Sequence, residues 1–304
     1  MSEEEWKRID VVFKLKTPLH IGYMPFGSYV VSPTRYYVPG RNFWGAITKI
    51  ITEYLYQNPK SNNYREIGRQ VMDNFRFSYF YIYDGKTIYL PRYIDDGLVY
   101  GEKDKTITKF EFEHKFIGSR VATEIDNDSF AAKDKSLHEI EFIHNKFKKD
   151  NGKIEDTKIA GIIWFKNDSK VNGNQIKKTD NGIFINNFNI IKELILGGES
   201  KYGFGHVLFD SVDTMNFPIE VEEGEIKVKI NKGVPLPTHL RYNKDINFKG
   251  DIELLTGRGY FDPKKFDRDG EKPGNVISKP EYYFSPGTII KKDSSTVNFN
   301  MPYQ

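Results

Sequence analysis

The sequence predicts an α+β protein, and three stretches carry this prediction. Residues 9–16 alternate apolar with polar side chains, which indicates a half-buried strand. From Asn42 to about Asn58 the apolar side chains follow a helical spacing instead, so one face of a helix is expected to pack on a core. Residues 75–93 alternate again on both sides of an Asp84-Gly85 turn, which indicates a hairpin.

The other elements follow in chain order. The first strand ends at Pro18, because proline cannot donate a hydrogen bond to a sheet. A short strand at residues 36–40 turns into the helix, for which Asn42 is the expected N-cap. The remaining expectations are an extended stretch at 106–121, a polar excursion at 123–136, a loop or hairpin tip at 145–158, a strand at 158–165, irregular chain at 166–187, a helix at 189–196 and a strand at 207–211.

This order of elements predicts the domain organisation. It corresponds to the β-α-β-β-α-β plan of a ferredoxin-like fold. We expect one such domain at residues 1–215, with a large insertion around 95–158. After residue 216 the alternating segments become short and are separated by proline and glycine. This pattern predicts a smaller β-rich domain at 216–304, either a full second ferredoxin-like domain or a degraded one.

Composition narrows the class of protein. The 304 residues carry a net charge of +3 and include no cysteine, which excludes disulfides, thiolate chemistry and a cysteine metal site. The apolar runs are far shorter than the roughly 20 residues that span a bilayer, and the acidic start is unlike a signal peptide. We therefore expect a cytoplasmic protein without a membrane partner. Residues 227–304 hold 14 Lys/Arg and 9 Asp/Glu, a local charge of +5, which would suit a phosphate-bearing partner.

The most unusual stretch is the glycine loop, residues 197–206. Four glycines occur in the nine residues 197–205. Glycine accepts positive φ and lets another molecule approach the backbone. Lys201 supplies a charge for phosphate, and Tyr202 and Phe204 supply rings on which a base could stack. The alternative is a helix C-cap at 197–198 followed by a tight turn.

Other candidate sites have weaker support in the sequence. His20 could act as a general base in RNA cleavage, or it could be a hydrogen-bonded loop residue. Arg41 and Lys49 lie on the first helix, and Arg41 is at its N-terminal end, which favours anion binding. Both residues could instead belong to a solvated face of the helix. Two sets of acidic or histidine residues are candidates for a metal site, but neither set is expected to bind a metal ion. They are Glu124, Asp126 and Asp128, and His138 with His144.

Four segments occur in a characteristic order: residues 17–22, residues 37–47, residues 118–143 and the glycine loop. Together they resemble the RAMP proteins, which are the RNA-binding subunits of CRISPR systems. Residues 17–22, Thr-Pro-Leu-His-Ile-Gly, resemble their strand-end signature, and residues 37–47, beginning Tyr-Val-Pro-Gly, resemble their helix entry. The segment 118–143 is similar to their R-x-x-I-D segment, and the glycine loop is similar to their G-rich loop. Residues 284–288, Phe-Ser-Pro-Gly-Thr, resemble a run near the end of the larger, two-domain members.

The resemblance implies a ferredoxin-like (RRM-like) fold and a non-catalytic, RNA-binding structural subunit of a type III-like effector ribonucleoprotein. Its implied partners are CRISPR RNA, other RAMP backbone subunits and the large polymerase-like subunit, and it implies no cofactor. The loop at 22–31 contains no acidic residue, unlike the target-cleaving backbone subunits. Length and the second β-rich region favour the subunit that holds the 5′ handle of the guide.

The loop, the helix and the resemblance together define the expected RNA-contacting set. It consists of His20, Arg41, Lys49, Arg120, Gly198, Lys201, Tyr202, Gly203, Phe204, Gly205 and His206. Three alternatives stay open: a guide-processing endoribonuclease that uses His20, a 3′-end capping or backbone RAMP subunit, and a protein-only assembly factor.

Overall fold

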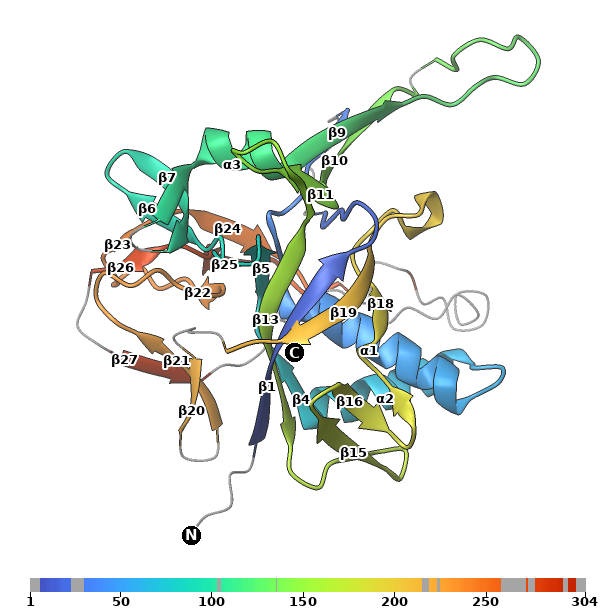
Figure 1. Cartoon of the computed structure of the whole chain (residues 1–304), viewed down its shortest axis with the longest axis vertical. Helices are drawn as coiled ribbons and strands as arrows, with labels where there is room; N and C mark the ends of the chain where they lie inside the picture. Colours follow the sequence, from blue (N-terminus) through green and yellow to red (C-terminus); the bar gives the residue numbers. More distant parts are fainter. Residues whose placement is uncertain are drawn as a thin grey trace.

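A seven-stranded antiparallel sheet forms the centre of the protein (Figure 1). The computed structural model describes residues 6–22, 30–102, 105–134, 136–214, 219–222, 225–257, 272, 277–291 and 295–298. The sheet order is β18-β19-β1-β13-β5-β3, and β4 also pairs with β13. These strands are β1 (Trp6–Leu15), β3 (Tyr37–Val38), β4 (Phe75–Phe77), β5 (Phe80–Tyr83), β13 (Lys158–Lys166), β18 (Glu193–Ile195) and β19 (His206–Val212).

Strand β1 lies inside the sheet and is covered on both faces. It pairs with β13 from Trp6↔Lys166 to Lys14↔Lys158, and with β19 on its other side. Its odd-numbered apolar residues from Ile9 to Leu15 belong to the main core, whereas Trp6 and Val12 belong to a second core on the opposite face. The sequence predicted a half-buried strand. The second face is buried because strands from the C-terminal region cover it.

Helices α1 (Gly40–Leu55) and α2 (Ser61–Asn74) cover the main-core face. Helix α1 starts at Gly40 with Pro39 as its N-cap, so the predicted N-cap Asn42 is wrong. A Cβ on Gly40 would lie 2.3 Å from the Phe77 backbone oxygen, so the helix start approaches β4 closely. The Phe43 ring stacks on Phe80 with the ring centroids 3.8 Å apart.

Residues 166–195 differ from the expected structure. The predicted irregular chain and the predicted helix at 189–196 are both wrong, because this segment forms a small antiparallel sheet followed by β18. Asn172 and Gly173 both have positive φ, as hairpin turns require, and they join the first two strands. The small sheet consists of β14 (Lys170–Val171), β15 (Asn174–Thr179), β16 (Gly182–Ile185) and β17 (Phe188–Asn189). The protein is therefore α+β as predicted, but strands occupy the place where the sequence predicted a second helix.

The region between β5 and β13 contains a second correction. The stretch predicted as extended at 106–121 includes helix α3 (Lys109–Phe116), which starts with a capping box between Thr108 and Glu111. Strands β9 and β10 then form an arm that projects from the body (Figure 1). The strands of this region are β6 (Pro91–Ile94), β7 (Gly97–Glu102), β8 (Lys105–Thr108), β9 (Ile117–Ala122), β10 (His138–Ile143), β11 (Lys146–Lys148) and β12 (Ile154–Asp156); β2 (Val31–Ser32) pairs with β10.

The described residues of the C-terminal region are built from strands. Ile219, Ile226 and Val228 pack against Trp6 and Val12, on the face of the main sheet opposite α1. A third core lies around Phe284. The strands are β20 (Ile219–Glu222), β21 (Glu225–Ile230), β22 (Leu240–Arg241), β23 (Phe248–Lys249), β24 (Ile252–Leu255), β25 (Glu281–Phe284), β26 (Ile289–Ile290) and β27 (Ser295–Asn298). Within the described ranges, no helix has the length and apolar character needed to cross a membrane.

The Phe43–Phe80 contact gives a test of this core. We expect Phe43→Ala to lower the free energy of unfolding by about 3–5 kcal/mol, because it empties a fully buried site. Phe110→Ala is the matched control, since it truncates the same side chain at a position of α3 that is 76% exposed, and it should change stability by less than about 0.5 kcal/mol. Urea unfolding followed by circular dichroism measures both. Equal losses would contradict this assignment of the core.

Candidate nucleic-acid interface

The glycine loop is a short 3₁₀ turn between two left-handed residues. The turn, η1, spans Ser200–Tyr202, with Glu199 at φ 56° before it and Gly203 at φ 83° after it. The neighbouring Gly197 and Gly205 also have positive φ, at 76° and 83°. The predicted helix C-cap is absent, because the loop follows strand β18 rather than a helix. The prediction of a glycine-dependent turn is confirmed.

The base of the loop is bound to the segment that follows β1. The Gly198 N–H donates to the His20 carbonyl oxygen at 2.9 Å, and the Gly205 N–H donates to the Pro18 carbonyl oxygen at 2.8 Å. A Cβ on Gly197 would lie 2.1 Å from the His20 oxygen, and one on Gly205 would lie 2.0 Å from the Leu196 oxygen. These two glycines therefore permit close backbone packing, whereas a Cβ on Gly203 would meet nothing within 4 Å.

His20 lies beneath the loop. Its side chain is only 4% exposed, and its Nδ1 is 2.7 Å from the Glu141 carbonyl oxygen. Because a carbonyl oxygen can only accept, Nδ1 carries the proton in this hydrogen bond. The ring also approaches the glycine loop, since a Cβ on Gly198 would lie 3.3 Å from its Cδ2. The geometry gives His20 a positioning role between β10 and the glycine loop.

The aromatic residues of the loop face in opposite directions. Tyr202 is 68% exposed, and Lys201 beside it is exposed as well. Phe204 is 7% exposed and packs edge-on against Phe142 of β10, with ring centroids 5.4 Å apart. The prediction that Phe204 offers a ring face for a base is therefore wrong, because the phenyl group is used to attach the loop to β10. His206, at the start of β19, places its Nε2 2.6 Å from the Glu193 carboxylate.

The other predicted contact residues lie on separate surfaces. Lys49 lies on α1, 3.9 Å from Glu53, beside a groove of about 650 Å³ between α1 and strands β16–β18. Arg120 is exposed on β9 of the arm. Arg41 lies near the start of α1, with its guanidinium 6.0 Å from the centroid of the Trp44 ring, and it lines a cavity described below. The structure therefore brings together His20 and the glycine loop, but not the complete predicted set.

The segments weighed as metal sites are hydrogen-bonded internally. Asp126 Oδ1 accepts hydrogen bonds from the Ser129 N–H and hydroxyl at 2.8 and 2.9 Å. Glu124 pairs with Lys133 at 3.1 Å. His138 begins strand β10 and His144 follows its end, so the two histidines lie at opposite ends of this strand. In the part of the chain that is described, no three His, Cys, Asp or Glu side chains form a group suited to a metal ion.

Sequence reasoning missed a cavity between the N-terminal part of the chain and strand β24. We call it the β24 cavity; its volume is about 670 Å³. Five tyrosines line it, from three separate parts of the chain. Its lining includes Gly22, Thr34, Arg35, Tyr36, Tyr37, Arg41, Tyr79, Tyr93, Tyr100, Lys109, Glu141, His239 and residues 251–256. Gly22, Tyr37 and Arg41 lie in segments that the sequence singled out, but no local motif connects them with His239 and residues 251–256, which join them only in the folded chain.

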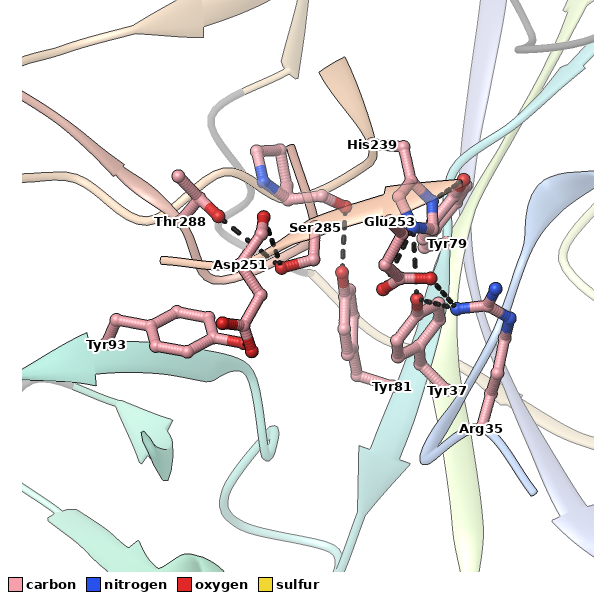
Figure 2. A network of polar contacts seen from close by, with 11 residues as sticks. Arg35, Tyr37, Tyr79, Tyr81, Tyr93, His239, Asp251, Glu253, Ser285 and Thr288 are labelled. Atoms are coloured by element: carbon pink, nitrogen blue, oxygen red, sulfur yellow. Dashed lines mark hydrogen bonds and ion pairs between the residues drawn. The ribbon is translucent and has the colours of Figure 1, made fainter. Parts of the chain in front are cut away.

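A buried polar network forms one wall of the β24 cavity (Figure 2). The Arg35 Nη1 donates to Glu253 Oε2 at 2.6 Å and to the Tyr37 hydroxyl at 2.7 Å. On the other side of Glu253, its Oε1 lies 3.3 Å from His239 Nε2. The Tyr79 hydroxyl lies 2.7 Å from His239 Nδ1. Because the carboxylate accepts from Nε2–H, Nδ1 is left to accept from the Tyr79 hydroxyl.

The pKa shifts of the side chains in this network determine which of them are ionised. Burial alone would raise the pKa of Glu253, but the hydrogen bond from His239 and the charge of Arg35 lower it to about 2. Burial lowers the pKa of His239 and raises the pKa of Tyr79. Near neutral pH, Glu253 is therefore ionised and paired with Arg35, while His239 and Tyr79 are neutral.

No protein-family model matches this sequence, and no curated protein matches it. Among solved structures, a chain of the Type III-B Cmr-beta complex bound to cognate target RNA is similar over 93% of this chain and 86% of that chain, with a TM-score of 0.51 and 12% identity. A chain of the same complex bound to target RNA and AMPPnP, state 1, gives the same coverage and TM-score at 13% identity. At this identity the likeness concerns the fold. The resemblance to RAMP-like CRISPR-associated proteins is thereby confirmed at the level of the fold.

The glycines provide a test of the loop geometry. Gly203→Ala should lower the free energy of unfolding by about 1–2 kcal/mol, the cost of placing an L-residue in the left-handed region. Gly205→Ala should cost more, because its Cβ would also collide with the Leu196 oxygen. Chemical denaturation of the two variants measures the difference. A larger loss for Gly203→Ala would contradict the described loop.

The Arg35–Glu253 pair predicts a pH dependence. Glu253→Gln should lower the free energy of unfolding by about 3 kcal/mol near pH 7, because it leaves Arg35 buried without its counter-charge. The folded pKa of Glu253 is depressed, so its stabilising contribution is complete above the unfolded value of about 4.3 and is lost as the pH falls toward 2. The gap between wild type and variant should therefore narrow from pH 5 downward.

The control for this measurement is Glu281→Gln. Glu281 pairs with Arg241 at 2.7 Å, but both side chains are exposed, so its loss should change stability by less than about 1 kcal/mol. A gap between wild type and Glu253→Gln that does not change between pH 7 and pH 2.5 would contradict the assignment.

Proposed function

We propose that this chain is a non-catalytic, CRISPR RNA-binding structural subunit of a type III-like effector ribonucleoprotein that holds the 5′ handle of the guide RNA. The glycine loop is the observation that carries the proposal. Backbone hydrogen bonds hold its base on residues 18–20, while Lys201 and Tyr202 are exposed at η1. A cation and an accessible ring are the two components by which proteins grip single-stranded RNA. The fold shared with a chain of an RNA-bound complex supports this assignment.

We interpret the main sheet as a modified ferredoxin-like, RRM-like core. Its order β19-β1-β13-β5 is consistent with that plan, with strands β14–β18 in the place of the second helix. In an RRM the open sheet face stacks RNA bases. Here both faces are packed against other parts of the chain. RNA contact is therefore assigned to the loops at the end of the sheet rather than to the sheet itself.

The arm formed by β9 and β10 supports the proposed protein partners, namely other RAMP backbone subunits and the large polymerase-like subunit. It carries the exposed apolar side chains of Val121, Ile125, Phe130 and Leu137. Apolar side chains gathered on a projecting element are characteristic of an interaction surface. Arg120 adds a positive charge on the same arm, so that it could contact RNA or an acidic partner surface.

The burial of His20 bears on the alternative enzyme function. A general base must come within hydrogen-bond reach of the proton that it removes, and His20 lies beneath the loop with Nδ1 bonded to Glu141. This position supports the binding subunit over an endoribonuclease. The loop at 22–31, whose lack of an acidic residue is unlike the target-cleaving backbone subunits, lies mostly outside the described residues.

RNA binding by the full-length chain tests the proposal. Tyr202→Ala should raise the Kd for labelled repeat RNA about 5- to 150-fold, because stacking on one ring contributes about 1–3 kcal/mol. Binding should also weaken with salt. Tyr282→Ala, at an equally exposed tyrosine on β25, should leave the Kd unchanged. Fluorescence anisotropy at two salt concentrations measures these constants, and gel analysis of the same samples detects cleavage.

Each outcome separates the candidate functions. Cleavage that is lost in His20→Ala would establish the guide-processing endoribonuclease instead. Binding that prefers the 3′ end of the guide would establish the 3′-capping or backbone subunit. A chain that binds no RNA, alone or with its partners, would establish a protein-only assembly factor.

A further inference from the structure

The β24 cavity has the dimensions of a ligand site. Its volume of about 670 Å³ lies within the roughly 300–1,000 Å³ typical of small-molecule pockets. Five tyrosines line it, and of these Tyr36 and Tyr93 are only half-buried. The Tyr36 ring packs against Phe112, with ring centroids 5.5 Å apart, and both Tyr36 and Tyr93 keep part of their surface exposed, whereas Tyr37, Tyr79 and Tyr100 are buried. A planar aromatic ligand would find ring faces here.

The lining carries three carboxylates and three cations, so its charges balance. The three carboxylates each accept a hydrogen bond within the protein: Glu253 from Arg35 at 2.6 Å, Asp251 from the Tyr93 hydroxyl at 2.5 Å, and Glu141 from the Thr34 N–H at 3.2 Å. Arg35 is neutralised by Glu253. Arg41 and Lys109 are the two further cations of the lining. They lie at the beginnings of α1 and α3. Lys109 is exposed and its Nζ lies 3.7 Å from the Glu113 carboxylate, and the Arg41 guanidinium lies 6.0 Å from the Trp44 ring centroid.

Residues 251–256, which include strand β24, line the same cavity. Strand β24 is the edge strand of the sheet β22-β25-β24 and pairs only with β25 among the described residues. The Asp251 oxygen accepts from the Ser285 N–H at 2.9 Å, so by strand alternation the N–H and C=O of Ile252 and Leu254 point to the free edge. These groups offer alternating donors and acceptors beside the side chains of Ile252 and Leu254, which are partly exposed. A nucleobase edge presents the matching pattern.

The cavity also adjoins the segment that holds the glycine loop. Gly22 lines the cavity, and His20 contacts Gly198 of the loop. Two residues of extended chain span at most about 7 Å. The base of the glycine loop and the edge of the cavity are therefore connected by the short segment 20–22.

We propose that the β24 cavity is a second RNA subsite that takes up one unstacked base of the bound strand. Tyr36 and Tyr93 contact the base, the free edge of β24 forms hydrogen bonds with it, and Arg41 and Lys109 contact the adjoining phosphates. This inference rests on the proposed function, because it concerns the same RNA. It adds base selection to the grip of the glycine loop, since backbone donors and acceptors distinguish one base edge from another.

Photocross-linking of the full-length chain to single-stranded RNA that contains 4-thiouridine tests the subsite, with the modified peptides identified by mass spectrometry. Adducts are expected on peptides with Tyr36 or Tyr93 in addition to Tyr202. Lys109→Glu should abolish the cavity adducts, keep the Tyr202 adduct and reduce the salt slope of binding by about 1. Lys86→Glu, at an exposed lysine outside the cavity lining, should change none of these.

The outcomes separate this inference from the proposed function. Adducts at Tyr202 alone would overturn the subsite and leave RNA binding by the glycine loop standing. Adducts at neither place would overturn both. Cavity adducts that persist in Lys109→Glu with an unchanged salt slope would overturn the phosphate contact. Protection of residues 252–255 from hydrogen exchange by a partner protein without RNA would assign the edge of β24 to an extended peptide instead.

Discussion

The candidate surfaces of this protein depend on the hydrogen bonds of one segment, residues 16–22, which continues β1 beyond the sheet. The backbone of Lys16 bonds to His206, that of Leu19 bonds to Ile143, and that of His20 bonds to Gly198. Ile21 bonds through its N–H to the Thr34 hydroxyl and through its oxygen to the Arg35 N–H. One short segment thus fixes the glycine loop, strand β10 of the arm and the wall of the β24 cavity relative to one another.

This arrangement explains why the loop needs several glycines with different structural roles. Gly197 and Gly205 lie where backbone meets backbone: a side chain on Gly197 would collide with the His20 oxygen, and one on Gly205 would collide with the Leu196 oxygen. Gly203 lies in open space and supplies only a left-handed conformation. Phe204 closes the inner side of the loop on Phe142, and this contact leaves Lys201 and Tyr202 as the exposed part. The loop is therefore a rigid support for the side chains of Lys201 and Tyr202 rather than a flexible segment.

The C-terminal region has a comparable structural role on the other side of the sheet. Ile219, Ile226 and Val228 bury the face that β1 and β13 leave uncovered, and Glu253 pairs with Arg35 across 218 positions of the chain. The polar network and the apolar contacts together join the two parts of the molecule. The β24 cavity lies along this junction, where neither part alone would enclose a ligand.

Local signals in the sequence led to correct predictions where a single element determines its own pattern. The strand at 158–165 and the helix after Pro39 were predicted with ends close to the observed ones. Two of the errors fell where a local signal was present but overlooked. Thr108 and Glu111 form a capping box at the start of α3, and Asn172-Gly173 forms the hairpin turn that begins the small sheet at 170–189.

By itself, the sequence determined the alternating strand, the amphipathic helix and the glycine positions of the loop, because side-chain periodicity and positive φ are properties of neighbouring residues. Only the tertiary structure decided which faces are covered and which side chains remain exposed. It turned Phe204 inward, placed His20 beneath the loop and gathered Arg35, His239 and Glu253 into one network. The physical reason is that burial and charge pairing depend on segments far apart in the chain, which no local pattern records.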